Sequence, residues 1–218
     1  MHKTKVIIRG DSCPILYWIA SSKNEDYVGN MADSIAALSG STSFILSTIL
    51  VESWDDDLTP WRAKKPFKGG EYSGSGLRTL DELRSVMAEF EKGRAVTKRF
   101  IGGYSLAGLF SLWAFYESGC FDGAASCSGS LWYPGWVDYA KRTVPPEGSI
   151  VYLSLGDREE YTKNQVMAQV GSCIQNQYEL LMHDKNIAHC TYELNSGGHF
   201  KDPEERMAKG FSWFLTHA

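Results

Sequence analysis

Short apolar runs alternate with longer amphipathic segments along most of the chain. The short runs, rich in β-branched and aromatic residues as strands are, lie at residues 5–9, 14–20, 43–51, 99–102, 123–128, 150–155 and 190–194. The segments with apolar residues three or four positions apart, as in helices, lie at residues 26–38, 80–90, 106–116, 136–142, 162–183 and 203–216. This alternation predicts an α/β fold, with a mostly parallel central sheet flanked by helices.

One long segment, residues 52–76, follows neither pattern and is rich in Asp, Pro, Gly, Trp and Lys. A loop of this length in a compact domain is usually functional or disordered. There is no internal repeat and no low-complexity linker, and 218 residues suit one domain. We therefore expect a single domain over residues 1–218.

Charge and hydropathy argue against two classes of partner. Lys and Arg total 22 against 26 Asp and Glu, a net charge of −4, which gives no support to nucleic-acid binding. No uncharged apolar run reaches the ~18–20 residues of a membrane span. The first residues carry no signal-peptide pattern, so we expect a cytoplasmic protein without a membrane partner.

The cysteine pattern predicts neither disulfides nor a metal site. The chain has five cysteines, which are widely spaced and form no C-x-x-C pair. Disulfide frameworks and zinc sites show tighter spacing. We expect free thiols and no bound metal.

The strongest chemical signal is the sequence Ile-Gly-Gly-Tyr-Ser-Leu-Ala-Gly at residues 101–108. A strand enters a turn centred on Ser105 and leaves as a helix, the context of the G-x-S-x-G nucleophile elbow. Gly103 provides the small residue that the tight turn needs, and Ala107 replaces the second glycine. The helix beginning at Leu106 would aim free N–H groups at a developing oxyanion. The alternative is a glycine-rich turn that merely carries a serine.

A serine nucleophile needs a base, and His199 occupies the expected place. It lies in Asn-Ser-Gly-Gly-His-Phe at residues 195–200, between the last predicted strand and the last predicted helix. In this arrangement the order along the chain is Ser, then acid, then His. The remaining histidines, at the termini or at ends of elements, are expected on the surface: His2, His183, His189 and His217.

The acid is predicted in the turn Gly-Asp-Arg-Glu-Glu at residues 156–160, which follows a strand. Its task is to accept the second imidazole N–H and to stabilise the imidazolium. We favour Glu159 slightly over Asp157, and Glu160 is a third candidate.

With these motifs placed, the chain resembles the esterase D-type, or putative esterase, branch of the α/β-hydrolases, which includes siderophore and feruloyl esterases. The resemblance covers most of the chain and rests on residues 54–61, 103–108, 128–132, 155–160 and 195–200. It implies the α/β-hydrolase fold and a serine carboxylesterase without metal or organic cofactor. It also favours Glu159, because many relatives carry the acid three residues after the glycine.

One departure concerns the oxyanion hole that the resemblance implies. Relatives commonly carry His-Gly where this chain has Ala20 and Ser21, in the loop that supplies one backbone donor. A backbone N–H needs no particular side chain, so the Ala20–Ser21 turn can still serve. The second donor is expected to be the N–H of Leu106.

Aromatic side chains are candidates for substrate binding. Trp54, Trp132 and Tyr133 follow carboxyl ends of predicted strands, where ligands bind in open α/β sheets. Tyr104 precedes the nucleophile. Plain loop anchoring is the alternative for the three that follow strands. No long insertion separates the strand at 123–128 from the acid turn, so we expect no large lid and a fairly open site.

The sequence thus predicts hydrolysis of a small-molecule carboxylic ester, with a short acyl group, through an acyl-enzyme. A thioesterase, a siderophore esterase or an acyltransferase on the same triad remains an alternative. A non-catalytic binding protein of the same fold is the alternative from another class. An open sheet edge could pair two copies in a homodimer, but no motif specifies one.

Overall fold

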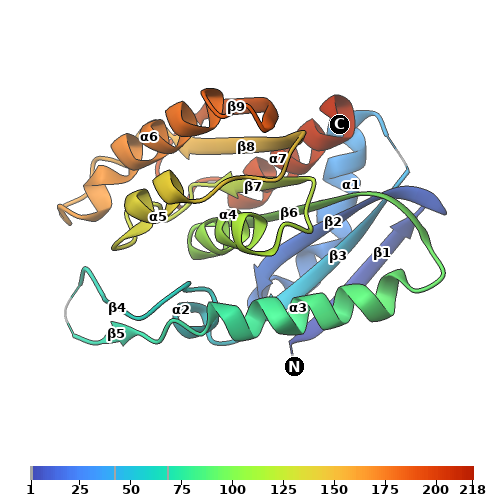
Figure 1. Ribbon diagram of the computed structural model, residues 1–218, viewed down its shortest axis with the longest axis horizontal. Coiled ribbons are helices and arrows are strands. Elements are labelled where there is room, and N and C mark those ends of the chain that lie inside the picture. Colours follow the sequence, from blue (N-terminus) through green and yellow to red (C-terminus); the bar gives the residue numbers. More distant parts are fainter. Residues whose placement is uncertain (1, 42, 68) are drawn as a thin grey trace.

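The computed structural model describes residues 2–41, 43–67 and 69–218. A seven-stranded sheet in the order β1-β3-β2-β6-β7-β8-β9 runs through the molecule (Figure 1). β1 pairs antiparallel with β3, and the other neighbouring strands are parallel. The strands are β1 (Lys3–Arg9), β2 (Ser12–Ser21), β3 (Phe44–Val51), β6 (Ala95–Tyr104), β7 (Gly123–Cys127), β8 (Ser149–Gly156) and β9 (Ile187–Asn195).

Helices cover both faces of this sheet. One apolar cluster joins the sheet to α1 (Val28–Ser39) and α7 (Pro203–His217). A second, larger cluster on the other face joins it to α3 (Gly76–Glu91), α4 (Leu106–Ser118), α5 (Trp136–Arg142) and α6 (Val170–Met182). Both the fold class and the mostly parallel sheet predicted from the sequence are confirmed.

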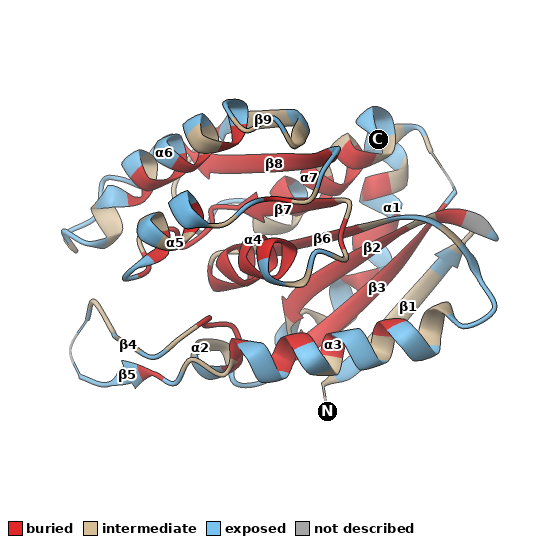
Figure 2. Ribbon diagram, in the orientation of Figure 1, coloured by how far each residue is buried: buried red, intermediate tan, exposed pale blue. Residues whose placement is uncertain are grey.

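Burial explains the continuous apolar runs of the central strands. Every residue of β3, β7 and β8 is buried, while the edge strand β1 is only partly covered (Figure 2). A parallel sheet packed on both faces needs apolar residues at successive positions rather than at alternate ones. α4 is apolar all round because it is buried from Leu106 to Tyr116.

The strand order reverses beside β2. The chain builds β3 on one side of β2 and later adds β6 on the other side. At such a reversal the loops after neighbouring strands diverge and leave a crevice at the carboxyl ends of the strands. Ser21 ends β2 and Ser105 follows β6, so both residues lie at this crevice.

The helix predicted over residues 162–183 is wrong in its first part. α6 begins only at Val170, after a short 3-10 helix at Met167–Gln169. The side chain of Asn164 accepts hydrogen bonds from the backbone N–H groups of Val166 (3.0 Å) and Met167 (3.2 Å). An asparagine that bonds to nearby N–H groups in this way stabilises a turn in competition with a helix.

The predicted loop at residues 52–76 contains short elements. These are a one-turn helix α2 (Trp54–Asp57) and a two-stranded hairpin of β4 (Ala63–Lys64) and β5 (Glu71–Tyr72). α3 begins at Gly76, four residues before the predicted start, because the N–H of Gly76 bonds to the carbonyl of Thr59 (2.9 Å). That contact lies between distant residues, which a periodicity pattern does not detect.

Two further expectations concern thiols and membranes. All five cysteines lie in the described part of the chain and are free thiols, three of them buried. Among the described residues, the helices are too short or too polar for any one of them to cross a bilayer.

Between β7 and β8 the chain adds only α5, so the large lid that the sequence argued against is absent from this described segment.

Candidate active site

Ser105 sits on a strained turn between β6 and α4. Its backbone has φ 59° and ψ −120°, a conformation that non-glycine residues rarely adopt. The turn is also crowded, because a Cβ added to Gly103 would lie 2.4 Å from the carbonyl carbon of Ala107. The glycine at 103 therefore makes room for the alanine at 107. This geometry has the features of a nucleophile elbow, which lifts a side chain above the sheet.

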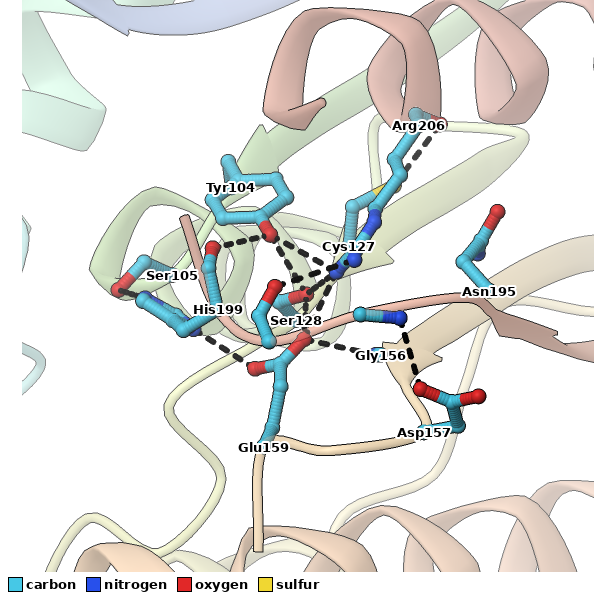
Figure 3. A network of polar contacts seen from close by, with 12 residues as sticks. Tyr104, Ser105, Cys127, Ser128, Gly156, Asp157, Glu159, Asn195, His199 and Arg206 are labelled. Carbon is cyan, nitrogen blue, oxygen red and sulfur yellow. Dashed lines mark hydrogen bonds and ion pairs between the residues drawn. The ribbon is translucent and has the colours of Figure 1, made fainter. Parts of the chain in front are cut away.

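The side chain of Ser105 is in line with a histidine and a carboxylate. The Oγ of Ser105 lies 3.1 Å from Nε2 of His199, and Nδ1 of His199 lies 2.7 Å from Oε2 of Glu159 (Figure 3). The three residues come from the β6–α4 turn, the β9–α7 loop and the turn after β8. A base bonded both to a hydroxyl and to an orienting carboxylate is the arrangement that activates a serine.

Glu159 is held in a buried site and stays ionised. It is 7 % exposed, and its Oε1 accepts hydrogen bonds from the Oγ of Ser128 (2.6 Å) and the N–H of Gly156 (2.7 Å). Burial acts to raise the pKa of Glu159, but the hydrogen bonds from His199 and Ser128 outweigh it and hold the pKa below its ordinary value. The carboxylate is thus negatively charged where an imidazolium would form.

Asp157, the alternative acid, has a different partner. Its Oδ1 accepts the backbone N–H of Gly197 at 2.7 Å, and its own N–H donates to the carbonyl of Asn195 at 2.8 Å. The N–H of Arg158 also bonds to the carbonyl of Gly197 (3.1 Å). Asp157 thus ties the turn after β8 to the loop that carries His199, and Glu159 contacts the imidazole. The third candidate, Glu160, does neither in the described hydrogen bonds.

Tyr104, expected to bind substrate, is also tied to the histidine loop. Its hydroxyl donates to the backbone carbonyl of His199 at 2.7 Å, and the two rings lie 5.4 Å apart between centroids. Burial raises the pKa of Tyr104 to about 12, so the phenol keeps the proton that this bond requires. Tyr104 lines the cleft and supports His199 at the same time.

The expected oxyanion donors lie around Ser105. Leu106 is the first residue of α4, and the first N–H groups of a helix have no acceptor within the helix. Ala20 and Ser21, at the end of β2, line the cavity beside Ser105. The backbone donor roles of these three residues stay predictions.

Two cavities meet at Ser105 and His199. The larger, of about 600 Å³, extends toward the end of β2 and is lined by Trp18, Ser21, Trp54, Tyr104, Phe200 and Met207. The smaller, of about 260 Å³, extends toward α6 and is lined by Ser130, Trp132, Arg158, Tyr161, Met167 and Phe200. Phe200 belongs to both, is 91 % exposed, and packs edge-on against His199 at 5.1 Å between ring centroids.

The aromatic predictions divide between the cleft and the loop. Trp54 lines the larger cavity, and Trp132 lines the smaller one. The prediction that Tyr133 binds substrate is wrong, because this residue is only 2 % exposed and lines neither cavity. Its ring packs on Trp61 and Tyr72, and its hydroxyl donates to the carbonyl of Trp61. Tyr133 therefore anchors the 52–76 loop, the alternative weighed for it.

Several side chains that contact the site had no role assigned from the sequence. Ser130 lies 3.4 Å from Ser105 between hydroxyl oxygens, Ser128 donates to Glu159, and Arg206 contacts Glu159. The sequence did carry one signal for Arg206. It lies one helical turn before Gly210, so in a helix both fall on the same face, and in α7 that face is buried.

In residues 2–41, 43–67 and 69–218, His, Cys, Asp and Glu form no group of three or more suited to a metal ion.

Solved structures with the same fold include several esterases. The siderophore hydrolase EstA from Aspergillus nidulans superposes with a TM-score of 0.71 at 18 % identity, over 94 % of this chain and 83 % of that one. An IroE-like serine hydrolase from Shewanella oneidensis has a TM-score of 0.79 at 13 % identity, over 99 % and 80 %. A ferulic acid esterase has a TM-score of 0.63 at 14 % identity, over 98 % and 91 %.

Sequence comparison adds no relative to these structures. No protein-family model matches the chain, and neither does any curated protein. Because the sequence identities are below 20 %, the superpositions establish a shared fold only, and the chemistry has to be argued from the site. The sheet order, the elbow between β6 and α4 and these superpositions agree, and the chain has the α/β-hydrolase fold, as the structurally similar siderophore and ferulic acid esterases do.

Proposed function

We propose that the protein is a serine hydrolase of carboxylic esters. The observation that carries the proposal is the continuous contact from Ser105 Oγ to His199 (3.1 Å) and from His199 to Glu159 (2.7 Å), on a strained elbow in an open cleft. Backbone strain of this kind costs about 1–3 kcal/mol and is concentrated at active sites, so it supports a functional role for this turn. The named activities of the structurally similar proteins support the same reaction class.

In the proposed reaction Ser105 attacks the ester carbonyl while His199 accepts its proton at Nε2. Glu159 holds the imidazole by its Nδ1–H and stabilises the imidazolium. The backbone N–H groups of Leu106 and of the Ala20–Ser21 turn would bind the oxyanion. His199 then protonates the leaving alcohol, and water activated by the same histidine releases the acid from Ser105.

The cavity at the proposed nucleophile has room for substrates larger than short acyl esters. Pockets of roughly 300–1,000 Å³ hold ligands of drug size, and the larger cavity, about 600 Å³, falls in that range. The second candidate function is therefore hydrolysis of a siderophore ester, supported also by the names of EstA and of the enterobactin and salmochelin hydrolase IroE. Both candidates use the same three residues and differ in substrate alone.

A fluorophosphonate probe tests the shared chemistry. We expect covalent labelling of the folded protein, with the label located on Ser105 by mass spectrometry of the modified peptide. Ser105→Ala is the control and should not be labelled. A folded, monodisperse wild-type sample without label would contradict the proposal and favour a binding protein of the same fold.

Substrate panels then separate the two candidates. Rates of hydrolysis are measured for p-nitrophenyl acetate, for a feruloyl ester and for a catechol-type siderophore triester. A kcat/KM at least tenfold higher for the triester would favour the siderophore candidate. The opposite order would favour the short-acyl esterase.

A further inference from the structure

A buried arginine lies behind the proposed acid. Arg206, from the first turns of α7, is 2 % exposed, and its guanidinium points from the helix into the polar network around Glu159 (Figure 3). Taking a guanidinium out of water is costly unless its charge is paired and its N–H groups are bonded. Its position therefore requires strong partners, and all of them lie at the proposed active site.

The first partner is the carboxylate itself. Nη1 of Arg206 lies 2.8 Å from Oε1 of Glu159, the oxygen that does not contact His199. With Ser128 and Gly156 also bonded to Oε1, this oxygen is fully engaged. Only Oε2 is then left to face the imidazole, so the arginine helps to decide which way the carboxylate is turned.

The remaining partners are the Oγ of Ser128, at 3.1 Å from Nη1, and groups that belong to the loop of the base or contact it. Nη2 of Arg206 lies 3.2 Å from the carbonyl of Gly198 and 3.4 Å from that of Ser196, just before His199. Nη1 also lies 3.0 Å from the hydroxyl of Tyr104, which donates to the carbonyl of His199. A planar guanidinium holds such partners in a fixed relative geometry, which a single ammonium does not.

We propose that Arg206 is a positioning residue that joins the acid and the base of the site, and this assignment rests on the proposed hydrolase function. One rigid side chain contacts Glu159 on one nitrogen and the His199 loop on the other. Among the described contacts Arg206 is not bonded to Ser105, and it is not itself a lining residue of either cavity, although several of its bonding partners are. Its effect on the reaction is therefore expected to pass through the Glu159–His199 contact.

A double-mutant cycle measures how much of the effect of Arg206 depends on Glu159. The readout is the second-order rate constant for labelling of Ser105 by a fluorophosphonate, determined for wild type, Arg206→Met, Glu159→Gln and the double variant. We expect Arg206→Met to lower the rate by ~100-fold in the wild-type background, as misplacement of a reacting group does. In the Glu159→Gln background, where the acid is already lost, the further decrease should be less than about threefold.

The matched control is Lys209→Met, on the same helix one turn further along. Lys209 bonds to Glu193 (3.0 Å) and Asn195 (2.9 Å) and contacts none of Ser105, His199 and Glu159. Its labelling rate should stay within about threefold of wild type. The low-field proton NMR signal of the His199 Nδ1–H bond gives a second readout, expected to shift in Arg206→Met and to persist in Lys209→Met.

Arg206→Lys repeats the cycle if the methionine variant does not fold. It keeps the charge but loses the two-sided geometry, and a decrease of ~10-fold is expected in the wild-type background alone. Equal decreases in both backgrounds, or wild-type rates in both arginine variants, would overturn the positioning role. Wild-type protein that is not labelled at all would instead overturn the proposed function, so the two failures are distinguishable.

Discussion

Ser105, the proposed nucleophile, and its two partners are held in place by different means. Ser105 is positioned by backbone geometry within one short segment, from Gly103 to Gly108, whose small residues allow a strained turn. Glu159 and His199 are 40 residues apart in the sequence and are positioned by side chains, chiefly Asp157, Tyr104 and Arg206. The first device depends on small residues in one short turn and on backbone hydrogen bonds of Ser105 with Cys127 (3.0 Å) and Ser130 (3.1 Å). The second is a network and depends on several distant partners.

The difference predicts how each part responds to mutation. A change at Gly103 or at the side chain of Ser105 should affect chemistry or backbone strain and leave the bonds of Asp157, Tyr104 and Arg206 in place. Removing one member of the network should affect the others, because they share hydrogen bonds. The following experiments test this comparison.

The largest effect is expected for Ser105→Ala. Hydrolysis should fall by roughly 10⁵–10⁶-fold in kcat, as for removal of a serine nucleophile. The melting temperature should stay close to that of wild type, because the hydroxyl is at the cleft and Ala keeps the Cβ. Enzyme assays with a p-nitrophenyl ester and thermal denaturation check both points. A variant that keeps more than a few per cent of the wild-type rate would refute the assignment.

The next effect separates the two carboxylates. Glu159→Gln should lower kcat by roughly 10⁴-fold, the loss expected when the imidazole tautomer is wrongly set. Asp157→Asn removes a contact to the loop backbone and not to the imidazole, so a loss below about tenfold is expected. Both variants are compared under saturating substrate. Equal small losses would mean that neither carboxylate orients His199.

A third experiment tests the crowding of the elbow. In Gly103→Ala the new Cβ would lie 2.4 Å from the carbonyl carbon of Ala107, so the backbone must shift. We expect a loss of about 1–3 kcal/mol in the free energy of unfolding, measured by urea denaturation. Gly29→Ala, in α1 with no atom within 4 Å of the added Cβ, is the control and should stabilise by about 0.5–1 kcal/mol. The same sign for both variants would argue against a crowded turn.

The smallest effect concerns strain at Ser105 itself. Ser105→Gly should be more stable than Ser105→Ala by about 1 kcal/mol, because glycine adopts φ 59° and ψ −120° without steric cost. Urea denaturation of the two inactive variants measures the difference. An alanine variant as stable as the glycine variant would mean that the turn stores no strain.

The sequence predicted the elements whose signal is local. The buried strands are continuous apolar runs, and the elbow needs only a strand, small residues and a helix in succession, so both could be recognised without knowledge of the rest of the molecule. The order of Ser105, acid and His199 also follows the strand order. Two predicted helix boundaries were wrong, one where Asn164 bonds to nearby N–H groups and one where Gly76 bonds to the distant carbonyl of Thr59.

By itself, then, the sequence determined the class of fold and singled out Ser105 and His199 as candidates for nucleophile and base, because each signal depends on neighbours a few residues away. Only the tertiary structure decided between Asp157 and Glu159 as the partner of His199, since both stand in the same turn and differ in the direction of their side chains. The tertiary structure also packed Tyr133 against Trp61 and Tyr72 of the 52–76 loop and brought Arg206 to Glu159. These assignments depend on contacts between residues far apart in the chain, which hydrophobic periodicity does not encode.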